Sequence, residues 1–121
     1  MSKILIVQDS PSVNMMLKFR LESEGFSVEA VETGGEGIES AVSGEYNIIL
    51  LDYNLPDING VEVCNALRQK ENLSKTPILF ISAKDEAELS RLTKDTGADG
   101  HISLTADTKD LIIKIRELLG T

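Results

Sequence analysis

The most informative stretch of this 121-residue chain is Asn47-Ile48-Ile49-Leu50-Leu51-Asp52-Tyr53-Asn54-Leu55-Pro56. Its apolar half is short and bounded, which is typical of a strand buried on both faces of a parallel sheet. Four further segments have a strand-like composition: Lys3–Val7, Ser27–Val31, 77–81 and 100–104. The sequence therefore predicts five strands. Residues 27–31 are expected nearest an edge, because their apolar residues alternate with polar ones.

Helical patterns with recognisable ends lie between these strands. Each begins at a residue type that caps helices, and these residues are Ser10, Thr33, Asn59, Asp85 and Asp107 or Thr108. The third helix is expected to reach about Lys70, and the fourth is expected to end near Gly97. The residues expected to face the core recur at helical spacing: Val13, Met16, Leu17, Leu21, Ile38, Ala41, Val42, Val63, Ala66, Leu67, Leu111, Ile115 and Leu118.

The strict alternation of strand and helix, with short connections, predicts right-handed crossovers and a parallel sheet covered by helices on both faces. The expected fold class is α/β: a doubly wound, flavodoxin-like sheet of five strands in the order 2-1-3-4-5, with five helices. We expect residues 1–121 to form one domain, since this length suits a single core.

The composition excludes several classes of function. Twenty acidic residues against 12 basic ones give a net charge of -8, which disfavours direct binding to nucleic acid or to an anionic membrane. The single Cys64 and the single His101 exclude a disulfide framework and a multi-histidine metal site. No apolar run is long enough to span a membrane, and the N-terminus lacks the pattern of a signal peptide. We therefore expect a cytoplasmic protein.

Ligands of such sheets bind at the carboxyl ends of the strands, between the first and third. The expected strand order brings Asp9 and Asp52 side by side, where two carboxylates repel each other. A divalent cation relieves such repulsion, and oxygen ligands with room for water suit Mg²⁺. An aspartate in this position is also a nucleophile towards phosphorus. The alternative is that both acids only cap the helices that follow them.

Four segments together resemble the receiver domain of response regulators, the phosphorylatable module of two-component signalling, and in particular the chemotaxis receivers. Each segment is weakly specific alone, but they are ordered and correctly spaced over nearly the whole chain. They are Lys3-Ile-Leu-Ile-Val-Gln-Asp-Ser-Pro11, Ile48-Ile-Leu-Leu-Asp-Tyr-Asn-Leu-Pro-Asp-Ile-Asn-Gly60, Thr76-Pro-Ile-Leu-Phe-Ile-Ser-Ala83 and Gly97-Ala-Asp99.

The resemblance implies a role for each matching residue. Asp52 would accept a phosphoryl group from a histidine kinase or a phosphotransfer protein. Asp9, Asp52 and the backbone carbonyl of Asn54 would hold Mg²⁺, and the Ser82 hydroxyl would bond the phosphoryl group and move a loop. His101 occupies the position of a switch aromatic. The output partner would bind the face of the fourth helix, fifth strand and fifth helix, and the domain would be no enzyme beyond its own phosphorylation and dephosphorylation.

Two positions depart from the family pattern. Gln8 replaces the first of two acids after the first strand, and Leu104 replaces a lysine after the fifth. A lysine there forms a charge-assisted hydrogen bond, which is worth roughly 1.5–3 kcal/mol. Losing one acid and one base leaves the formal charge of the site at -2, so Mg²⁺ still neutralises it, with Gln8 offering a neutral oxygen. Lys84, two residues beyond Ser82, is a candidate to substitute in part for the missing ammonium, and the alternative, which we favour, is a solvated residue in the first turn of the next helix.

These departures leave two functions open. One is a weakened or unconventional phosphorylation switch at Asp52, and the other is a pseudo-receiver that binds a protein partner without phosphate. A third alternative is a phosphatase of the haloacid-dehalogenase type, which also uses a strand-end aspartate and Mg²⁺. That class needs a second acid two residues after the nucleophile, where this chain has Asn54.

Overall fold

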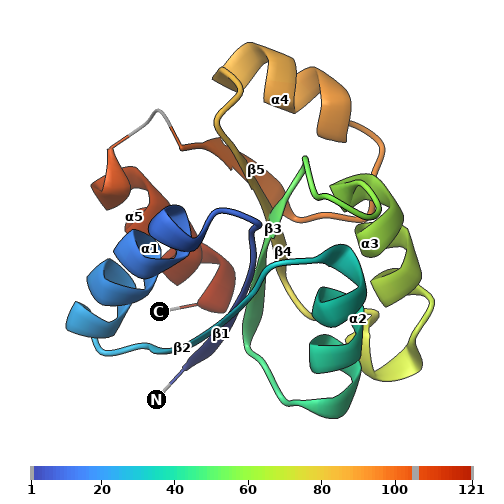
Figure 1. The fold of residues 1–121 in the computed structure, drawn as a ribbon, viewed down its shortest axis with the longest axis horizontal. Helices are drawn as coiled ribbons and strands as arrows, with labels where there is room; N and C mark the ends of the chain where they lie inside the picture. Colours follow the sequence, from blue (N-terminus) through green and yellow to red (C-terminus); the bar gives the residue numbers. More distant parts are fainter. Residues whose placement is uncertain (1, 105–106, 121) are drawn as a thin grey trace.

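The computed structural model describes residues 2–104 and 107–120. Its five parallel strands are β1 (Lys3–Val7), β2 (Ser27–Val31), β3 (Ile48–Asp52), β4 (Ile78–Ser82) and β5 (Gly100–Ser103). They form one sheet in the order β2-β1-β3-β4-β5, which confirms the expected topology (Figure 1). β3 lies in the middle of the sheet, with β1 and β4 as its hydrogen-bonded neighbours.

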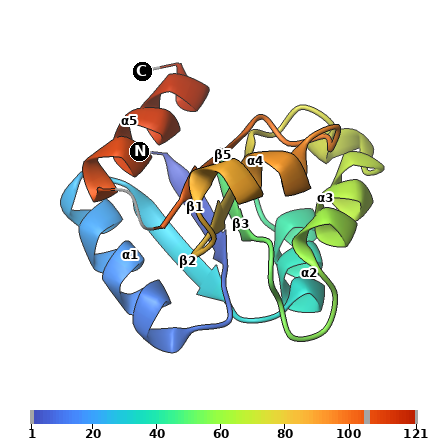
Figure 2. The ribbon, with the colours of Figure 1, turned by 90° about the horizontal axis from the view of Figure 1, so that it is seen from above.

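Helices cover both faces of the sheet. They are α1 (Pro11–Ser23), α2 (Gly34–Ser43), α3 (Gly60–Arg68), α4 (Glu86–Thr93) and α5 (Thr108–Leu119). α1 and α5 lie together on one face, while α2 and α3 lie on the other, as the two views show (Figures 1 and 2). Within the described residues, no helix is long and apolar enough to cross a membrane.

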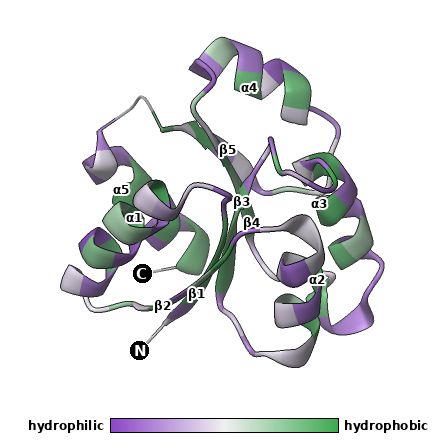
Figure 3. Ribbon diagram, viewed as in Figure 1, coloured by the Kyte–Doolittle hydropathy of each residue, from purple (hydrophilic) through white to green (hydrophobic). Residues whose placement is uncertain are grey.

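The strands are apolar on both sides because each side meets a layer of helices. Alternate residues of β1 belong to different cores: Ile4 and Ile6 pack towards α1 and α5, and Leu5 and Val7 pack towards α2 and α3. Figure 3 shows the result, with hydrophobic colour concentrated in the strands and hydrophilic colour along the outer sides of the helices.

Three details differ from the sequence-based expectations. Met16 and Val42 are exposed rather than buried, and Asn14 takes a core position on α1 because its amide donates to the Gln8 carbonyl at 2.7 Å. α4 ends at Thr93, four residues before the expected Gly97, and Asp95 then adopts a positive φ of 63°. A short 3₁₀ helix at Glu71–Leu73 follows α3, which ends earlier than Lys70.

Two residues of α3 lie against the sheet or within the core. A side chain on Gly60 would collide with the backbone oxygen of Asp52 and would lie 2.9 Å from the Phe80 ring, so only glycine permits this approach. Its backbone N–H donates to the Tyr53 carbonyl at 2.8 Å. Cys64 is fully buried in the core beneath α3, and burial raises the pKa of its thiol.

Candidate functional site

The carboxyl edge of the sheet forms a cavity of about 480 Å³. The residues lining it come from the ends of β1, β3, β4 and β5, from the loops that follow them and from the first turn of α1: Gln8, Asp9, Ser10, Val13, Asp52, Asn54, Ser82, Ala83, Lys84 and Leu104. The structure therefore brings Gln8, Asp9, Asp52, Asn54 and Ser82 together, as the sequence predicts. His101 does not line this cavity.

Asp52 is the last residue of β3 and has only 6% of its surface exposed. The pKa of its carboxyl is raised to about 6, mainly because burial disfavours the charged form, and also because Asp9 lies nearby. Hydrogen bonds oppose this rise, first from the Asn54 N–H, which donates to Asp52 Oδ1 at 3.3 Å, and then from the Gln8 side chain. Asp52 is thus a buried carboxyl whose negative charge is incompletely compensated.

Asp9 and Gln8 follow β1 and differ in exposure. Asp9 is exposed to solvent, whereas Gln8 is buried, with 5% of its surface exposed. The Gln8 side-chain oxygen accepts a hydrogen bond from the Ser10 N–H at 3.1 Å. In this arrangement the side-chain oxygen of Gln8 closes the turn before α1. Hydrogen bonding by the same side chain also lowers the pKa of Asp52.

The oxygen groups in this cavity suit a hard divalent cation. Asp9 and Asp52 supply two carboxylates, and Asn54 lines the same wall. Oxygen ligands with space for several waters are what Mg²⁺ prefers. Among the described residues, no three His, Cys, Asp or Glu side chains gather into a metal site. A cation here would therefore rest on two carboxylates and on neutral oxygens, because Gln8 stands where a third acid would be.

Ser82 ends β4 on the opposite wall of the cavity from β1. It is 1% exposed, and its hydroxyl oxygen accepts from the Lys84 N–H at 3.2 Å. Its backbone carbonyl accepts from the Leu104 N–H at 2.7 Å, so β5 continues beside it. Leu104 is partly buried, packs against the core under α1 and α5, and presents no charge to the cavity.

Lys84 is less exposed than the favoured sequence-based interpretation expects. It is not a freely solvated side chain: it lines the cavity and has 27% of its side chain exposed. Its ammonium lies 3.5 Å from Glu88 Oε1 and 5.8 Å from the centre of the Tyr53 ring. Its place two residues after the end of β4 was a usable signal, because βα loops at this edge carry the binding groups of such folds.

Comparison with known proteins identifies the family. A model of the response regulator receiver domain matches residues 4–116. The chain belongs to the response regulator receiver family. Receiver domains are the signal-receiving modules of two-component systems, so the chain is a signalling domain.

Curated relatives of this receiver domain support the assignment. It is 39% identical over 119 residues to the response regulator ArlR of Staphylococcus saprophyticus and 36% identical to ArlR of Staphylococcus aureus. Each alignment covers 98% of this chain and 53% of the relative. The receiver domain thus spans about half the length of these response regulators.

Solved structures agree with the fold. The response regulator TrrA of Thermotoga maritima, solved with Mg²⁺ and BeF, is 29% identical with a TM-score of 0.85, and the alignment covers 98% of this chain and 99% of TrrA. The chemotaxis response regulator CheY4 of Vibrio cholerae is 28% identical with a TM-score of 0.89, and 98% of each chain is covered.

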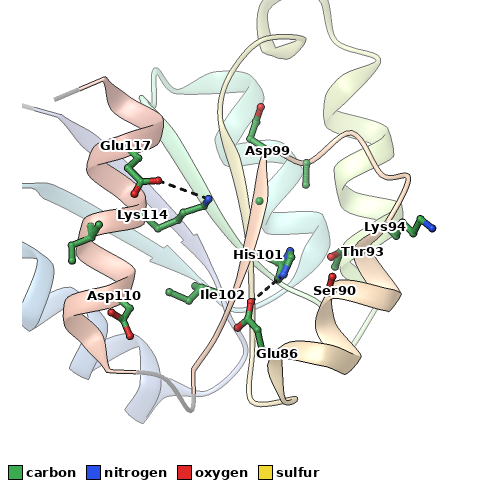
Figure 4. Close-up of a pocket in the computed structure, with 13 residues that line it drawn as sticks. Glu86, Ser90, Thr93, Lys94, Asp99, His101, Ile102, Asp110, Lys114 and Glu117 are labelled. Atoms are coloured by element: carbon green, nitrogen blue, oxygen red, sulfur yellow. Dashed lines mark ion pairs between the residues drawn. The ribbon is translucent and has the colours of Figure 1, made fainter.

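His101 of the receiver lies on a different surface, in a cavity of about 740 Å³ between α4, β5 and α5. Its Nε2 lies 3.0 Å from Glu86 Oε1, and the imidazole points towards the start of α4 (Figure 4). Glu86 also accepts from the Ser103 N–H at 3.0 Å. His101, a residue of β5, is therefore connected to the start of α4, and it does not line the cavity that holds Asp52.

Proposed function

We propose that residues 1–121 act as one receiver domain whose phosphoryl acceptor is Asp52. The observation that carries this proposal is the buried Asp52 carboxyl, which shares one cavity with the Asp9 carboxylate and the Ser82 side chain. Asp52 and Ser82 end neighbouring strands, β3 and β4, at the edge where such folds bind ligands.

In the proposed reaction a carboxylate oxygen of Asp52 attacks the phosphorus of the donor. A new P–O bond forms, the bond from phosphorus to the leaving group breaks, and the leaving group departs with that electron pair. From a phosphohistidine donor the leaving group is the imidazole, and from acetyl phosphate it is acetate. Hydrolysis later breaks the acyl phosphate with one water and returns the carboxylate. No other enzymatic activity is proposed.

The other residues position the reacting groups. Asp9, Asp52 and the backbone carbonyl of Asn54 would hold Mg²⁺, which neutralises negative charge on the carboxylates and on the phosphoryl oxygens when bound. The Gln8 side chain bonds Asp52 and opposes the rise of its pKa. The Ser82 hydroxyl, which now accepts from the Lys84 N–H, would donate to a phosphoryl oxygen.

A histidine kinase or a phosphotransfer protein is the proposed donor. α1 begins beside the cavity, and its outer side carries Met15 and Phe19, which are 74% and 76% exposed, together with Met16. A donor protein that reaches Asp52 passes over this apolar surface, and apolar contact is what association between proteins uses. Direct binding to nucleic acid is not proposed, because the chain carries a charge of -8.

The output partner is proposed to bind the face formed by α4, β5 and α5. This face is hollowed and charged, with Glu86, His101, Lys94, Asp110 and Lys114 lining its cavity (Figure 4). His101 would act as the switch residue, because its bond to Glu86 ties β5 to the start of α4. A shift of Ser82 would reach this face through the Leu104 N–H, which bonds the Ser82 carbonyl.

Phosphotransfer from acetyl phosphate with Mg²⁺, measured by intact mass, tests the acceptor. We expect the wild-type chain to gain the mass of one phosphoryl group and the Asp52→Asn variant to gain none. Equal gain in both proteins would contradict Asp52 as acceptor. No gain in the wild-type protein, with circular dichroism showing that it is folded, would contradict phosphorylation by small donors.

A second candidate function is a binding module that works without phosphate. Leu104 favours it, because this apolar residue follows β5, lines the cavity and offers the phosphoryl group no ammonium. In this case the Asp52→Asn variant would keep full activity in cells. Loss of that activity in a stably folded Asp52→Asn protein would contradict the binding-module function and favour the phosphorylation switch.

A further inference from the structure

A phosphoryl group on Asp52 adds negative charge to a cavity that already contains carboxylates. The cavity contains two carboxylates, Asp9 and Asp52, and phosphorylation replaces the single charge on Asp52 with about two. One divalent cation leaves this total negative. Among the described residues that line the cavity, Lys84 is the one basic residue.

The backbone of Lys84 is held firmly beside the cavity. Its N–H donates to the Ser82 hydroxyl oxygen at 3.2 Å, and its carbonyl accepts from the Ser103 hydroxyl at 2.6 Å. These two bonds attach Lys84 to the ends of β4 and β5. The point from which its side chain extends is therefore as fixed as the strands that carry Ser82 and Ser103.

The ammonium of Lys84, in contrast, is held weakly. Its carboxylate partner is Glu88, at 3.5 Å and one helical turn further along the chain, and both side chains are partly exposed. Such pairs contribute little to stability because water competes for both charges. The contact with the Tyr53 ring, at 5.8 Å, lies near the outer limit for a cation–π interaction. Neither contact prevents the ammonium from turning to a stronger partner.

We propose that Lys84 is the cationic partner of the phosphoryl group, and that its ammonium exchanges Glu88 for the phosphoryl oxygens when Asp52 is phosphorylated. The proposal rests on Asp52 as the acceptor. Charge-assisted hydrogen bonds to phosphoryl oxygens are stronger than an exposed ion pair, so the exchange is favourable. Glu88 lies in the first turn of α4, and the exchange therefore removes its counter-ion at the moment of phosphorylation.

Binding of the phosphoryl mimic beryllofluoride with Mg²⁺, followed through amide chemical shifts, measures the contribution of Lys84. We expect Lys84→Met to weaken binding about tenfold, the effect of losing one charge-assisted hydrogen bond. Lys84→Arg keeps the charge and should recover most of the affinity. Lys75→Met removes an exposed lysine from the opposite end of the sheet and should bind like the wild type.

Two outcomes separate the failure of this inference from the failure of the proposed function. If the wild-type protein binds no beryllofluoride and takes no phosphoryl group from acetyl phosphate, the proposed function fails. If the wild type does both, and Lys84→Met and Lys75→Met behave alike, the role of Lys84 is overturned while Asp52 remains the acceptor. Thermal unfolding of each variant controls for loss of structure.

A double-mutant cycle with Leu104 distinguishes a phosphoryl contact from a general effect of charge. Leu104→Lys places a second ammonium in the same cavity. If both lysines serve the same oxygens, Lys84→Met should cost less than about threefold in the Leu104→Lys background, against about tenfold alone. An unchanged tenfold cost would show that Lys84 acts elsewhere and would overturn the inference.

The exchange of partners has its own test. Glu88→Gln removes the resting partner of Lys84 and keeps the backbone N–H that bonds Asp85 at 2.8 Å. We expect this variant to bind beryllofluoride with Mg²⁺ about twofold to fivefold more tightly, as an exposed ion pair no longer competes. Weaker binding would overturn the exchange.

Discussion

The cavity has two sides that are built differently. The acceptor side consists of Gln8, Asp9, Asp52 and Asn54, at the ends of β1 and β3. The response side consists of Ser82, Lys84 and Leu104, at or just after the ends of β4 and β5, and it continues outside the cavity to Glu86, the first residue of α4. The acceptor side is held by paired strands and by the close approach of α3. The response side also depends on contacts between partly exposed side chains, such as the pair of Lys84 with Glu88.

This difference indicates that the two sides have different roles. The carboxylates that would bind metal and accept phosphate lie where the backbone has little freedom, so their relative positions are set before any ligand arrives. Lys84 and Glu86 instead make contacts that are individually weak, and each has a second partner, the Tyr53 ring for Lys84 and the Ser103 N–H for Glu86. Changes on the acceptor side should therefore have large effects on stability, and changes on the response side should have small effects on stability.

The largest expected effect is on stability, through the charge of Asp52. Its pKa lies above the ordinary value of 3.8, at about 6, so the folded state disfavours the ionised form. Protonation of this carboxyl therefore favours the folded state. Its contribution to the free energy of unfolding is complete below pH 3.8 and is lost as the pH rises through about 6. Asp52→Asn, which stays neutral, should be more stable than wild type at pH 7.5 by up to roughly 3 kcal/mol.

Urea unfolding of both proteins at pH 4 and pH 7.5 measures this difference. The gap between the variant and the wild type should narrow towards pH 4, where most of the Asp52 carboxyl is protonated in the folded protein. A gap that is the same at both pH values would assign the effect to packing instead of charge. Mg²⁺ at ten times its dissociation constant should raise the stability of the wild type by about 1.4 kcal/mol.

The next effect concerns the contact that fixes the acceptor side. Gly60→Ala places a methyl group against the Asp52 backbone oxygen and the Phe80 ring, and we expect a loss of about 1–3 kcal/mol in stability. Gly35→Ala is the matched control, because an added methyl group there meets only the Asp57 carboxylate, at 3.3 Å. Chemical denaturation of both variants should give a much larger loss for Gly60→Ala.

Metal affinity gives a third, smaller effect. Asp9→Asn removes one of the two carboxylates and should weaken Mg²⁺ binding about tenfold, because affinity for such cations depends on the charge of the ligands. Gln8→Glu restores an acid and should strengthen binding by a similar factor. Isothermal titration calorimetry measures both, with Glu71→Gln, an exposed acid before β4, as the control. Equal affinities in all four proteins would remove Asp9 from the metal site.

The smallest effect is expected on the response side. Glu86→Gln weakens the bond to His101 and should change stability by less than about 1 kcal/mol, because the Glu86 side chain is 57% exposed. The imidazole resonances of His101 should nevertheless shift, since its Nε2 loses a charged partner. If Glu86→Gln lowered the free energy of unfolding by more than about 2 kcal/mol, the response side would be held as firmly as the acceptor side.

Much of the fold followed from local patterns. The five strands and the helix caps at Ser10, Thr33 and Asn59 are set by residues near in sequence, so the sequence predicted them. Asn14 was missed because its burial depends on a hydrogen bond to the Gln8 carbonyl, which periodicity does not reveal. The early end of α4 was missed as well, because the glycine expected to end it, Gly97, lies beyond an irregular turn at Asp95.

The site was predictable where strand order alone determines proximity. Asp52 and Ser82 end neighbouring strands and Asp9 closely follows a third, so the expected topology was enough to place them in one cavity. The position of Lys84 was not predictable in the same way, because a loop residue has no fixed side-chain direction. The position of its backbone depends on bonds to Ser82 and Ser103, which come from two different strands.

The burial of Cys64 has a practical consequence for watching α4 respond. It is the only cysteine in the sequence, and its fully buried thiol has a raised pKa, so thiol-directed reagents should leave the native protein unlabelled. A cysteine introduced at the exposed Ser90 would then carry a fluorophore or spin label at one defined place on α4. No cysteine need be removed first, so the native packing beneath α3 remains intact while the label reports each encounter with a phosphoryl donor.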